Sequence, residues 1–256
     1  MSTAIVTGGA RGIGRAIAHR LGADGWRVGL LDLASDDLDE ATSGIDGAVK
    51  LVADISDESS VEAAFDTFGD AADLVVNNAG IVRFGPLLDL TCDDFSVVTT
   101  VNLVGTFTVA RAAARRMIAA EIGGNIINIT SMNGVAPGPN SGAYGATKAA
   151  IALLTQQMAL EWGPLGIRVN AIAPGLILAG MSDAIYADPQ ARHARESKVP
   201  LRRLGTAADI ASMVVFLASD AASYVTGQNI LVDGGVTMSM IANLPRPRSV
   251  DAVGMA

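Results

Sequence analysis

A tyrosine and a lysine one helical turn apart are the residues of this chain best placed to do acid/base chemistry. The segment Tyr144-Gly145-Ala146-Thr147-Lys148 puts the phenol and the ammonium group on one face of a predicted helix. The chain has three Tyr and three Lys, so about 0.04 pairs at this helical spacing are expected by chance. The pair therefore indicates a function.

A phenol beside a lysine fits proton transfer at an alcohol oxygen. A free phenol, with a pKa near 10, is a poor base at neutral pH, and a nearby ammonium group stabilises its anion. We expect Lys148 and the positive ring of oxidised nicotinamide to lower the pKa of Tyr144, so that Tyr144 is the acid/base when a hydride moves between an alcohol carbon and a nicotinamide. Lys148 would also hold the nicotinamide ribose. The hydroxyl of Ser131, which follows a predicted strand, would hydrogen-bond the substrate oxygen.

A glycine-rich loop near the start of the chain predicts a dinucleotide site. The run Thr7-Gly8-Gly9-Ala10-Arg11-Gly12-Ile13-Gly14 follows the first predicted strand and opens the first predicted helix. Glycines permit a tight turn and the approach of backbone amides to a pyrophosphate, which the helix N-terminus also favours. The expected cofactor contacts are Gly8, Arg11, Gly12, Ile13 and Gly14.

Asp32, at the end of the second predicted strand, favours NAD as the cofactor. A carboxylate there accepts hydrogen bonds from ribose hydroxyl groups and repels a 2′-phosphate. Arg11 favours NADP if its side chain reaches a 2′-phosphate; the alternative is that Arg11 faces solvent.

Further polar residues follow the third and fourth predicted strands, at the edge where ligands bind in open α/β sheets. We expect Asp54 and Ile55, and then Asn78, Ala79 and Gly80, to contact the adenine and ribose. For Asp54 and Asn78 the alternative is helix capping.

The elements that carry these residues alternate along the chain. Near-continuous apolar runs predict strands buried on both faces at 4–6, 28–31, 49–53, 74–76, 125–129, 168–172 and 229–232. Helical periodicity predicts helices near 13–24, 57–68, 103–121, 143–162 and 207–218. Repeated strand–helix units predict a doubly wound parallel α/β sheet in one domain, 1–256. Leu176–Leu204 and the tail after Gly235 do not fit the alternation, and such excursions often meet substrate.

Composition excludes several classes of function. The 256 residues are long enough to bury a core without disulfides, and the single cysteine, Cys92, cannot form an intrachain disulfide. The net charge of −8 argues against a nucleic-acid surface, and the acidity lies in residues 1–128, which hold 18 acidic and 9 basic side chains. The acidic positions between Asp36 and Asp94 are expected on solvated helix faces. We expect a cytoplasmic protein with no targeting or membrane segment and no metal.

Jointly, the motifs are specific for one family. Besides the glycine loop and the Tyr-x-x-x-Lys run, the chain has Asn-Asn-Ala-Gly at 77–80, Asn102, Ser131, Asn-Ala-x-x-Pro-Gly at 170–175, Arg-x-Gly at 203–205 and Val-Asp-Gly-Gly at 232–235. To about residue 235 the chain resembles the short-chain dehydrogenase/reductase family in its classical form.

The resemblance implies a Rossmann-like seven-stranded parallel sheet and a homo-oligomer, usually a tetramer. It implies a water relay through Asn102 and Lys148 to Tyr144, and it places Pro174, Gly175 and Ile177 beside the nicotinamide. The alternative for Asn102 is a helix-kinking or capping residue. One position departs from the family: Ala179 stands where a Thr often binds the nicotinamide carboxamide, so that contact would rely on backbone. Residues 1–125 would mainly bind the dinucleotide, 126–235 would hold catalytic and substrate residues, and 236–256 form a tail.

Candidate substrate residues come from two regions of the chain. The candidates flank the catalytic residues or lie in the excursion: Arg83, Ser131, Asn133, Val135, Asn140, Tyr144, Leu178, Met181 and Ile185. A basic cluster from Arg192 to Arg203 could draw a negatively charged substrate or subunit; the alternative is a solvated helix face. We expect the tail, with Met238, Met240, Ile241 and Leu244, to pack across a subunit boundary near an active site.

Three functions compete. The first is NAD-dependent interconversion of a secondary alcohol and a ketone, on a small polar alcohol such as a sugar or polyol. The second is an NADPH-dependent 3-oxoacyl or other carbonyl reductase, which Arg11 favours. The third is a nucleotide-sensing protein without turnover, against which the intact Ser131, Tyr144 and Lys148 argue.

Overall fold

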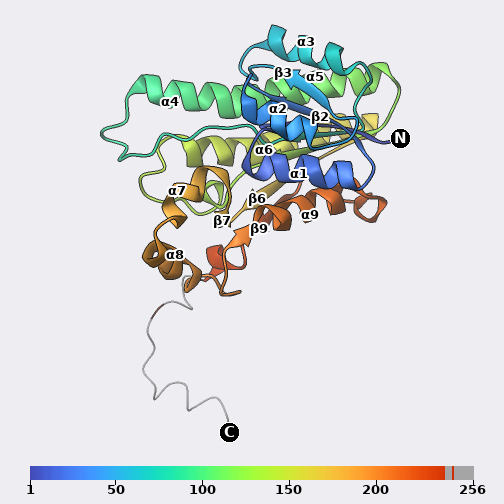
Figure 1. The fold of residues 1–256 in the computed structure, drawn as a ribbon. Coiled ribbons are helices and arrows are strands. Elements are labelled where there is room, and N and C mark those ends of the chain that lie inside the picture. Colours follow the sequence, from blue (N-terminus) through green and yellow to red (C-terminus); the bar gives the residue numbers. More distant parts are fainter. Residues whose placement is uncertain (240–243, 245–256) are drawn as a thin grey trace.

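The computed structural model describes residues 1–239 and 244 (Figure 1). Seven parallel strands form one sheet in the order β3-β2-β1-β4-β5-β6-β9. Their bounds are Thr3–Thr7 (β1), Arg27–Asp32 (β2), Val49–Val52 (β3), Leu74–Asn77 (β4), Gly124–Ile129 (β5), Ile167–Pro174 (β6) and Asn229–Val232 (β9). The predicted doubly wound parallel sheet is confirmed, and each predicted strand is present within two residues of its expected ends.

Burial explains why the strands read as continuous apolar runs. Strand β4 is buried at every position, and β1, β2, β5 and β6 at nearly every position, whereas β3 and β9 at the two sheet edges are partly exposed. Strand order changes direction between β1 and β4, and a crevice for a ligand opens at the carboxyl ends of the strands at such a point. The polar residues that are predicted to bind the cofactor lie at this edge, at or just after the ends of β2, β3 and β4.

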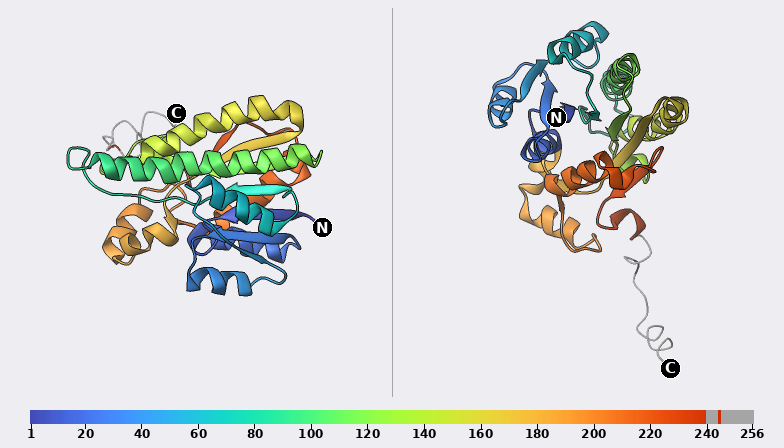
Figure 2. Two further views of the ribbon diagram at one scale, coloured as in Figure 1. Left: turned by 90° about the horizontal axis from the view of Figure 1, so that it is seen from above. Right: turned by 90° about the vertical axis from the view of Figure 1, so that its right-hand side faces the viewer.

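Helices cover both faces of the sheet (Figure 2). One core cluster joins α1 (Gly12–Ala23), α2 (Asp36–Ser43) and α9 (Ala207–Ala218) to the sheet, and the second joins α3 (Glu58–Phe68), α5 (Thr106–Ala119) and α6 (Tyr144–Trp162). The five predicted helices are confirmed. Helix α2 and the helix α4 (Cys92–Thr99) carry acidic first turns, which agrees with the predicted solvated acidic faces.

The helix predicted near 103–121 begins earlier than its sequence indicates. Helix α4 continues through a π-helical turn, Thr100–Gly105, directly into α5. The run Val97-Val98-Thr99-Thr100-Val101 is rich in β-branched residues, which lower helix propensity and obscured the first half of this helix.

The excursion at 176–204 has structure of its own. Strand β7 (Ile177–Leu178) pairs in parallel with β8 (Gly205–Thr206), and the short helices α7 (Asp183–Tyr186) and α8 (Pro189–Glu196) lie between them. In Figure 1 these helices extend beyond the carboxyl ends of the main strands. Residues 240–243 and 245–256 lie outside the described part of the chain, and so does most of the tail for which a subunit contact is expected.

Candidate active site

The glycine loop forms a cradle that side chains would fill. Gly8 has a φ of +66°, and a Cβ there would lie 2.7 Å from Nδ2 of Asn78. A Cβ on Gly14, in the first turn of α1, would overlap the carbonyl oxygen of Gly8. The loop therefore requires glycine at both positions, and its bare backbone at a helix N-terminus fits a pyrophosphate.

Hydrogen bonds from the end of β4 hold this loop in place. The buried hydroxyl of Thr7 accepts bonds from the amides of Asn78 (3.0 Å) and Ala79 (3.0 Å). The Nδ2 of Asn78 donates to the carbonyl oxygens of Thr7 (3.1 Å) and Gly8 (3.2 Å). Asn78 caps no helix; it shapes the loop. Sequence reasoning missed Thr7, although a Thr that ends a buried strand before Gly-Gly was the available signal.

Asp32 lies at the end of β2 beside the glycine loop. Its Oδ2 accepts a hydrogen bond from the amide of Ala10 (3.1 Å) and its Oδ1 accepts one from the amide of Leu33 (2.8 Å). A carboxylate has about four acceptor sites. Both oxygens of Asp32 therefore keep capacity for further donors such as ribose hydroxyl groups.

Arg11 lies on the outer side of the same loop. Its side chain is 80% exposed, and its Nε lies 3.5 Å from Oδ2 of Asp37 in α2. One helical turn along, Arg15 pairs with Glu40 at 2.8 Å. The exposure agrees with the solvent-facing interpretation of Arg11, and each of these two cations has a carboxylate partner.

Asp54 and Ile55 follow β3 at the next position along the same edge. Oδ1 of Asp54 accepts bonds from the amide (2.9 Å) and the hydroxyl (2.6 Å) of Ser56. The helix that follows is capped by Asp57, so the capping alternative for Asp54 is wrong. Ile55 is buried and packs against Gly105 in the π-helical turn, where a Cβ would come within 2.8 Å of it.

The catalytic candidates meet where β5 ends and α6 begins. Ser131 directly follows the β5 strand region and caps a short turn by accepting the amide of Asn133 at 3.1 Å. Tyr144 is the first residue of α6, and its side chain is hydrogen-bonded to Ser131. Lys148 is buried, donates from Nζ to the carbonyl oxygen of Ile129 at 2.7 Å, and lies over the Tyr144 ring at 5.6 Å. The three predicted side chains are therefore brought together.

Burial controls the electrostatics of this group. Desolvation raises the pKa of Tyr144 above its ordinary value of 10.0, and the hydrogen bond with Ser131 opposes that rise. Burial lowers the pKa of Lys148 from 10.5 to about 8. In the protein without cofactor, desolvation of the phenolate therefore holds the pKa of Tyr144 above its ordinary value, and the lowering expected from Lys148 together with the oxidised nicotinamide ring stays a prediction for the complex with cofactor.

Asn102 lies within the π-helical turn and is fully buried. Its Oδ1 accepts the amide of Ile81 at 2.8 Å, and its Nδ2 donates to the carbonyl oxygen of Ile81 at 2.9 Å and to the hydroxyl of Thr147 at 3.2 Å. A Cβ on Gly80 would lie 3.1 Å from Oδ1 of Asn102 and 3.6 Å from Nζ of Lys148. Asn102, Gly80 and Lys148 therefore lie close together near Tyr144. The π-helical turn that carries Asn102 is an irregularity of a kind often found at functional sites.

The end of β6 supplies the remaining predicted cofactor residues. Pro174 is the last residue of β6, and a Cβ on Gly175 would lie 2.5 Å from Cα of Asp233 in the Val-Asp-Gly-Gly run. Ile177 is buried in the core cluster that contains α1 and α9, and Ala179 packs against the same cluster. The backbone of this turn is therefore fixed by packing, whereas Ala179 offers no hydroxyl.

Comparison with known proteins decides the family. The family described as enoyl-(acyl carrier protein) reductase matches residues 8–237 of this chain. The chain is a short-chain dehydrogenase/reductase. This result, together with the seven-stranded sheet, confirms the predicted family and fold.

Relatives of this short-chain dehydrogenase act on varied alcohols. It is 39% identical over 246 residues to 3beta-hydroxysteroid dehydrogenase 1 of Eggerthella lenta, with 92% of this chain and 94% of that one covered. It is 40% identical over 250 residues to L-rhamnose 1-dehydrogenase (NAD(P)(+)) of Azotobacter vinelandii, with 93% and 97% covered. NAD⁺-bound xylitol dehydrogenase superposes with a TM-score of 0.86 at 35% identity over 91% of this chain and 98% of that one. The chain is an oxidoreductase of this family, acting on hydroxyl groups of small molecules with a nicotinamide dinucleotide.

Three predicted substrate residues of the dehydrogenase lie in the loop between Ser131 and Tyr144. Asn133 belongs to the turn that Ser131 caps. Val135 is exposed, and Asn140 has a φ of 62° and accepts the amide of Gly85 at 3.0 Å through its carbonyl oxygen. The loop thus contacts the segment that follows β4.

The other substrate candidates are more scattered. The Nε of Arg83 lies 3.8 Å from Oδ1 of Asp94 in α4, which directs its guanidinium toward that helix. Leu178 is partly exposed and Ile185 is half-buried in α7. The side chain of Met181 lies outside the described part of the structure.

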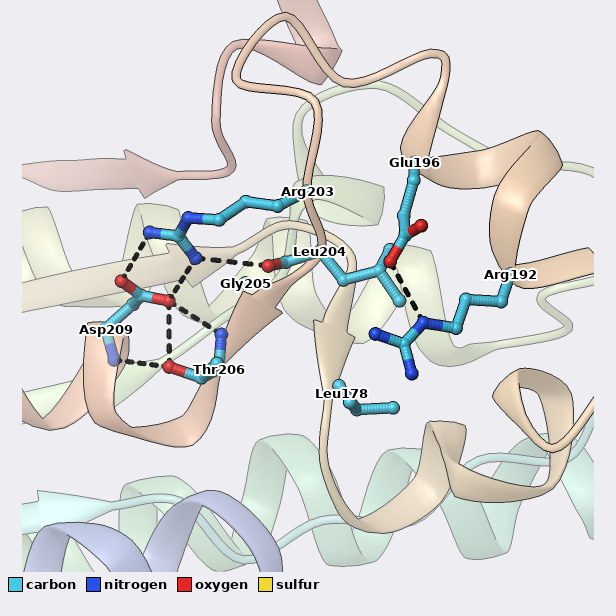
Figure 3. Close-up of a pocket in the computed structure, with 8 residues that line it drawn as sticks. All are labelled: Leu178, Arg192, Glu196, Arg203, Leu204, Gly205, Thr206 and Asp209. Atoms are coloured by element: carbon cyan, nitrogen blue, oxygen red, sulfur yellow. Dashed lines mark hydrogen bonds and ion pairs between the residues drawn. The ribbon is translucent and has the colours of Figure 1, made fainter. Parts of the chain in front are cut away.

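A cavity of about 470 Å³ lies between α8 and the β7–β8 pair (Figure 3). Its lining residues are Leu178, Arg192, Glu196, Arg203, Leu204, Gly205, Thr206 and Asp209. Arg192 pairs with Glu196 at 2.9 Å, and Arg203 binds both oxygens of Asp209 at 2.8 and 2.9 Å. These two members of the basic cluster are neutralised, which favours the solvated-face interpretation over attraction of an anion. Ser131 and Tyr144 are not among the lining residues, so this cavity is separate from the catalytic hydroxyl groups.

Residues 1–239 and 244 contain no group of three or more His, Cys, Asp or Glu side chains that could hold a metal. By length and composition the continuous helical run Cys92–Ala119 could cross a membrane, but 56% of its most apolar window is buried within the fold. Core helices of globular proteins pass the same test, so this run is explained by its packing on the sheet.

Proposed function

We propose that this enzyme interconverts a secondary alcohol and a ketone with NAD, and that its substrate is a small polar alcohol such as a sugar or polyol. The observation that carries the proposal is the convergence of Ser131, Tyr144 and Lys148 at the carboxyl end of β5, with Asp32 at the glycine loop. Ser131, Tyr144 and Lys148 would provide proton transfer, and Asp32 would select the cofactor.

In this proposal Tyr144 takes the proton from the substrate hydroxyl group as the alcohol is oxidised. Ser131, already hydrogen-bonded to Tyr144, holds the substrate oxygen and stabilises developing negative charge. Lys148 is placed by the carbonyl oxygen of Ile129 to stabilise the phenolate, and Asn102 lies beside it as part of a water relay. When bound, the nicotinamide dinucleotide supplies the acceptor or donor of the hydride.

The cofactor contacts proposed are those predicted from the sequence. Residues 1–125 would hold most of the dinucleotide, through Gly8, Arg11, Gly12, Ile13, Gly14, Asp32, Asp54, Ile55, Asn78, Ala79 and Gly80. Tyr144, Lys148, Pro174, Gly175 and Ile177, in the catalytic part at 126–235, would hold the nicotinamide half. The bare glycine loop and the spare acceptor capacity of Asp32 support this arrangement.

The charges around Asp32 support NAD over NADP. A 2′-phosphate would approach Asp32 and the acidic first turn of α2, which holds Asp36, Asp37 and Asp39. The cations at hand, Arg11 and Arg15, already pair with Asp37 and Glu40. Asp39 is likewise paired with Lys50 at 2.6 Å, so among the described residues Asp32 and Asp36 are the carboxylates that a phosphate would meet without a cation partner.

An NADPH-dependent 3-oxoacyl or other carbonyl reductase is the second candidate. The exposed Arg11 favours it, because its pair with Asp37 is long and on the surface, where ion pairs are weak.

The high cellular ratio of oxidised to reduced NAD would favour alcohol oxidation if NAD is the cofactor.

We also propose a homo-oligomer, a tetramer by the family resemblance, that works in the cytoplasm. The long helix formed by α4 and α5 lies beside α6 on the outside of the sheet (Figure 2). Between them an apolar groove of about 400 Å³ is lined by Leu103, Val104, Phe107, Ala150, Leu153, Leu154 and Gln157. Exposed apolar patches of this kind mark interfaces between subunits.

The test is a panel assay that follows formation of NADH. The purified enzyme is incubated with NAD⁺ or NADP⁺ and with sugars, polyols, hydroxy acids and aliphatic alcohols. Turnover with NAD⁺ and a sugar or polyol supports the proposal. Turnover confined to NADP⁺, or to reduction of ketones by NADPH, supports the reductase, and absence of turnover in both directions overturns the enzyme assignment.

A further inference from the structure

The hydroxyl of Thr147 connects the catalytic tyrosine to Asn102. Thr147 is in the first turn of α6, is 3% exposed, and donates from Oγ1 to the carbonyl oxygen of Tyr144 at 2.8 Å. The Oγ1 atom of Thr147 also accepts a hydrogen bond from Nδ2 of Asn102 at 3.2 Å. One hydroxyl group therefore bridges the helix that carries Tyr144 and the π-helical turn that carries Asn102.

With the bond to Thr147, the Asn102 carboxamide makes three hydrogen bonds to the protein. The other amide hydrogen of Asn102 and its Oδ1 are both bonded to the backbone of Ile81, which follows the Asn-Asn-Ala-Gly run. Thr147 thus fixes the Asn102 carboxamide against α6, and Ile81 fixes it against the loop after β4. The fully buried Asn102 has no solvent to replace the bond to Thr147 if that bond is lost.

We propose that Thr147 is a positioning residue, which sets the geometry of Tyr144 relative to Asn102 and Lys148 and so sets the pH at which Tyr144 works. The proposal rests on the proposed function, in which those three residues handle the proton. Thr147 itself is 3% exposed, and its hydroxyl is bonded to Tyr144 and Asn102. It acts through the first turn of α6.

The chain offers a matched control on the same helix. Thr155 is also buried, donates from Oγ1 to the carbonyl oxygen of Ile151 at 2.8 Å, and accepts Nδ2 of Asn128 at 2.9 Å. Its bonds have the same chemistry as those of Thr147, but they lie farther along α6, away from Tyr144. Thr155→Val therefore reproduces the structural cost without the change at the catalytic pair.

The test compares Thr147→Val, Thr147→Ser and Thr155→Val. We expect Thr147→Val to lower kcat about tenfold, the factor that the loss of one buried hydrogen bond allows, with little change in KM for the cofactor. The acidic limb of its kcat profile moves to higher pH, because the phenolate of a displaced Tyr144 is stabilised less by Lys148, which Ile129 holds in place. Thr147→Ser keeps the hydroxyl group and restores both kcat and the limb, and Thr155→Val lowers the melting temperature and leaves the limb in place.

The proposal is overturned if the acidic limb of the kcat profile also moves in Thr155→Val. It is likewise overturned if Thr147→Val is less stable but keeps the limb in place, since either result means that Thr147 has only a structural role. If Thr147→Val cannot be purified folded, Thr147→Ala takes its place, because it adds no bulk. Ultraviolet difference titration of the Tyr144 phenol, with Tyr144→Phe as blank, reads the pKa without turnover. An upward shift in the Thr147 variant then supports the proposal even if the panel assay refutes the substrate class.

Discussion

The Nζ atom of Lys148 lies 5.6 Å from the centre of the Tyr144 ring, one helical turn away, and is held there by its bond to the carbonyl oxygen of Ile129. Its hydrogen bond goes to the backbone of β5 and not to the phenol. In the proposed mechanism Lys148 would therefore act on Tyr144 through space and not through a hydrogen bond to the phenol.

Replacing Tyr144 by Phe removes the proposed acid/base and leaves the ring. We expect kcat to fall by about 10²- to 10⁴-fold, the usual contribution of a general acid/base, while the affinity for NADH measured by fluorescence changes little. Tyr224→Phe is the matched control, because the Tyr224 side chain is fully exposed. Near wild-type turnover in Tyr144→Phe would assign the proton transfer to another group.

The buried lysine makes stability depend on pH with a defined sign. Burial lowers the pKa of Lys148 from 10.5 to about 8, so between these values the unfolded chain holds a proton that the folded chain has released. The free energy of unfolding therefore rises with pH across this window, relative to a Lys148→Met variant, which has no such group. We expect the difference between wild type and variant to grow by about 1 to 3 kcal/mol from pH 8 to pH 10.5.

Urea unfolding at equal protein concentrations measures that difference, since oligomer stability depends on concentration. A flat or falling difference would show that Lys148 is not buried as a largely neutral amine. The same variant should lose activity, because it cannot stabilise the Tyr144 phenolate.

Features carried by one segment were predictable from the sequence. The buried strands and the Tyr144–Lys148 pair depend on spacing within a strand or a helix. The bond between Asn102 and Thr147, and the bonds from Asn102 to Ile81, join residues far apart in the chain. The raised pKa of Tyr144 in the protein without cofactor was not predictable for the same reason: pairwise spacing shows the ammonium group, whereas desolvation depends on everything packed around the phenol.

The pair between Arg11 and Asp37 predicts how cofactor preference can be changed. Asp37→Asn frees Arg11 for a 2′-phosphate, so kcat/KM with NADP⁺ should rise about threefold, the factor that an exposed ion pair allows. Asp32→Asn removes the carboxylate proposed to bind the ribose and should raise the ratio of kcat/KM with NADP⁺ to kcat/KM with NAD⁺ further. Asp36→Asn makes the same change of charge in the same helical turn as the Asp37 variant, without breaking the Arg11 pair, and serves as control. Equal effects of the Asp36 and Asp37 variants would show that net charge alone matters.

The groove between α5 and α6 predicts where subunits meet. Leu153 is 61% exposed and lines the groove with Phe107 and Val104. An aspartate at 153 would place a charge in an apolar contact, and such a charge without a partner is costly to bury. Leu153→Asp should therefore reduce the assembly to a smaller species in sedimentation equilibrium, with the fold preserved by circular dichroism. Leu88→Asp changes a leucine that is 99% exposed in the loop before α4 and should leave the mass unchanged. If the wild-type protein sediments as a monomer, or if Leu153→Asp also leaves the mass unchanged, the groove is not an interface between subunits.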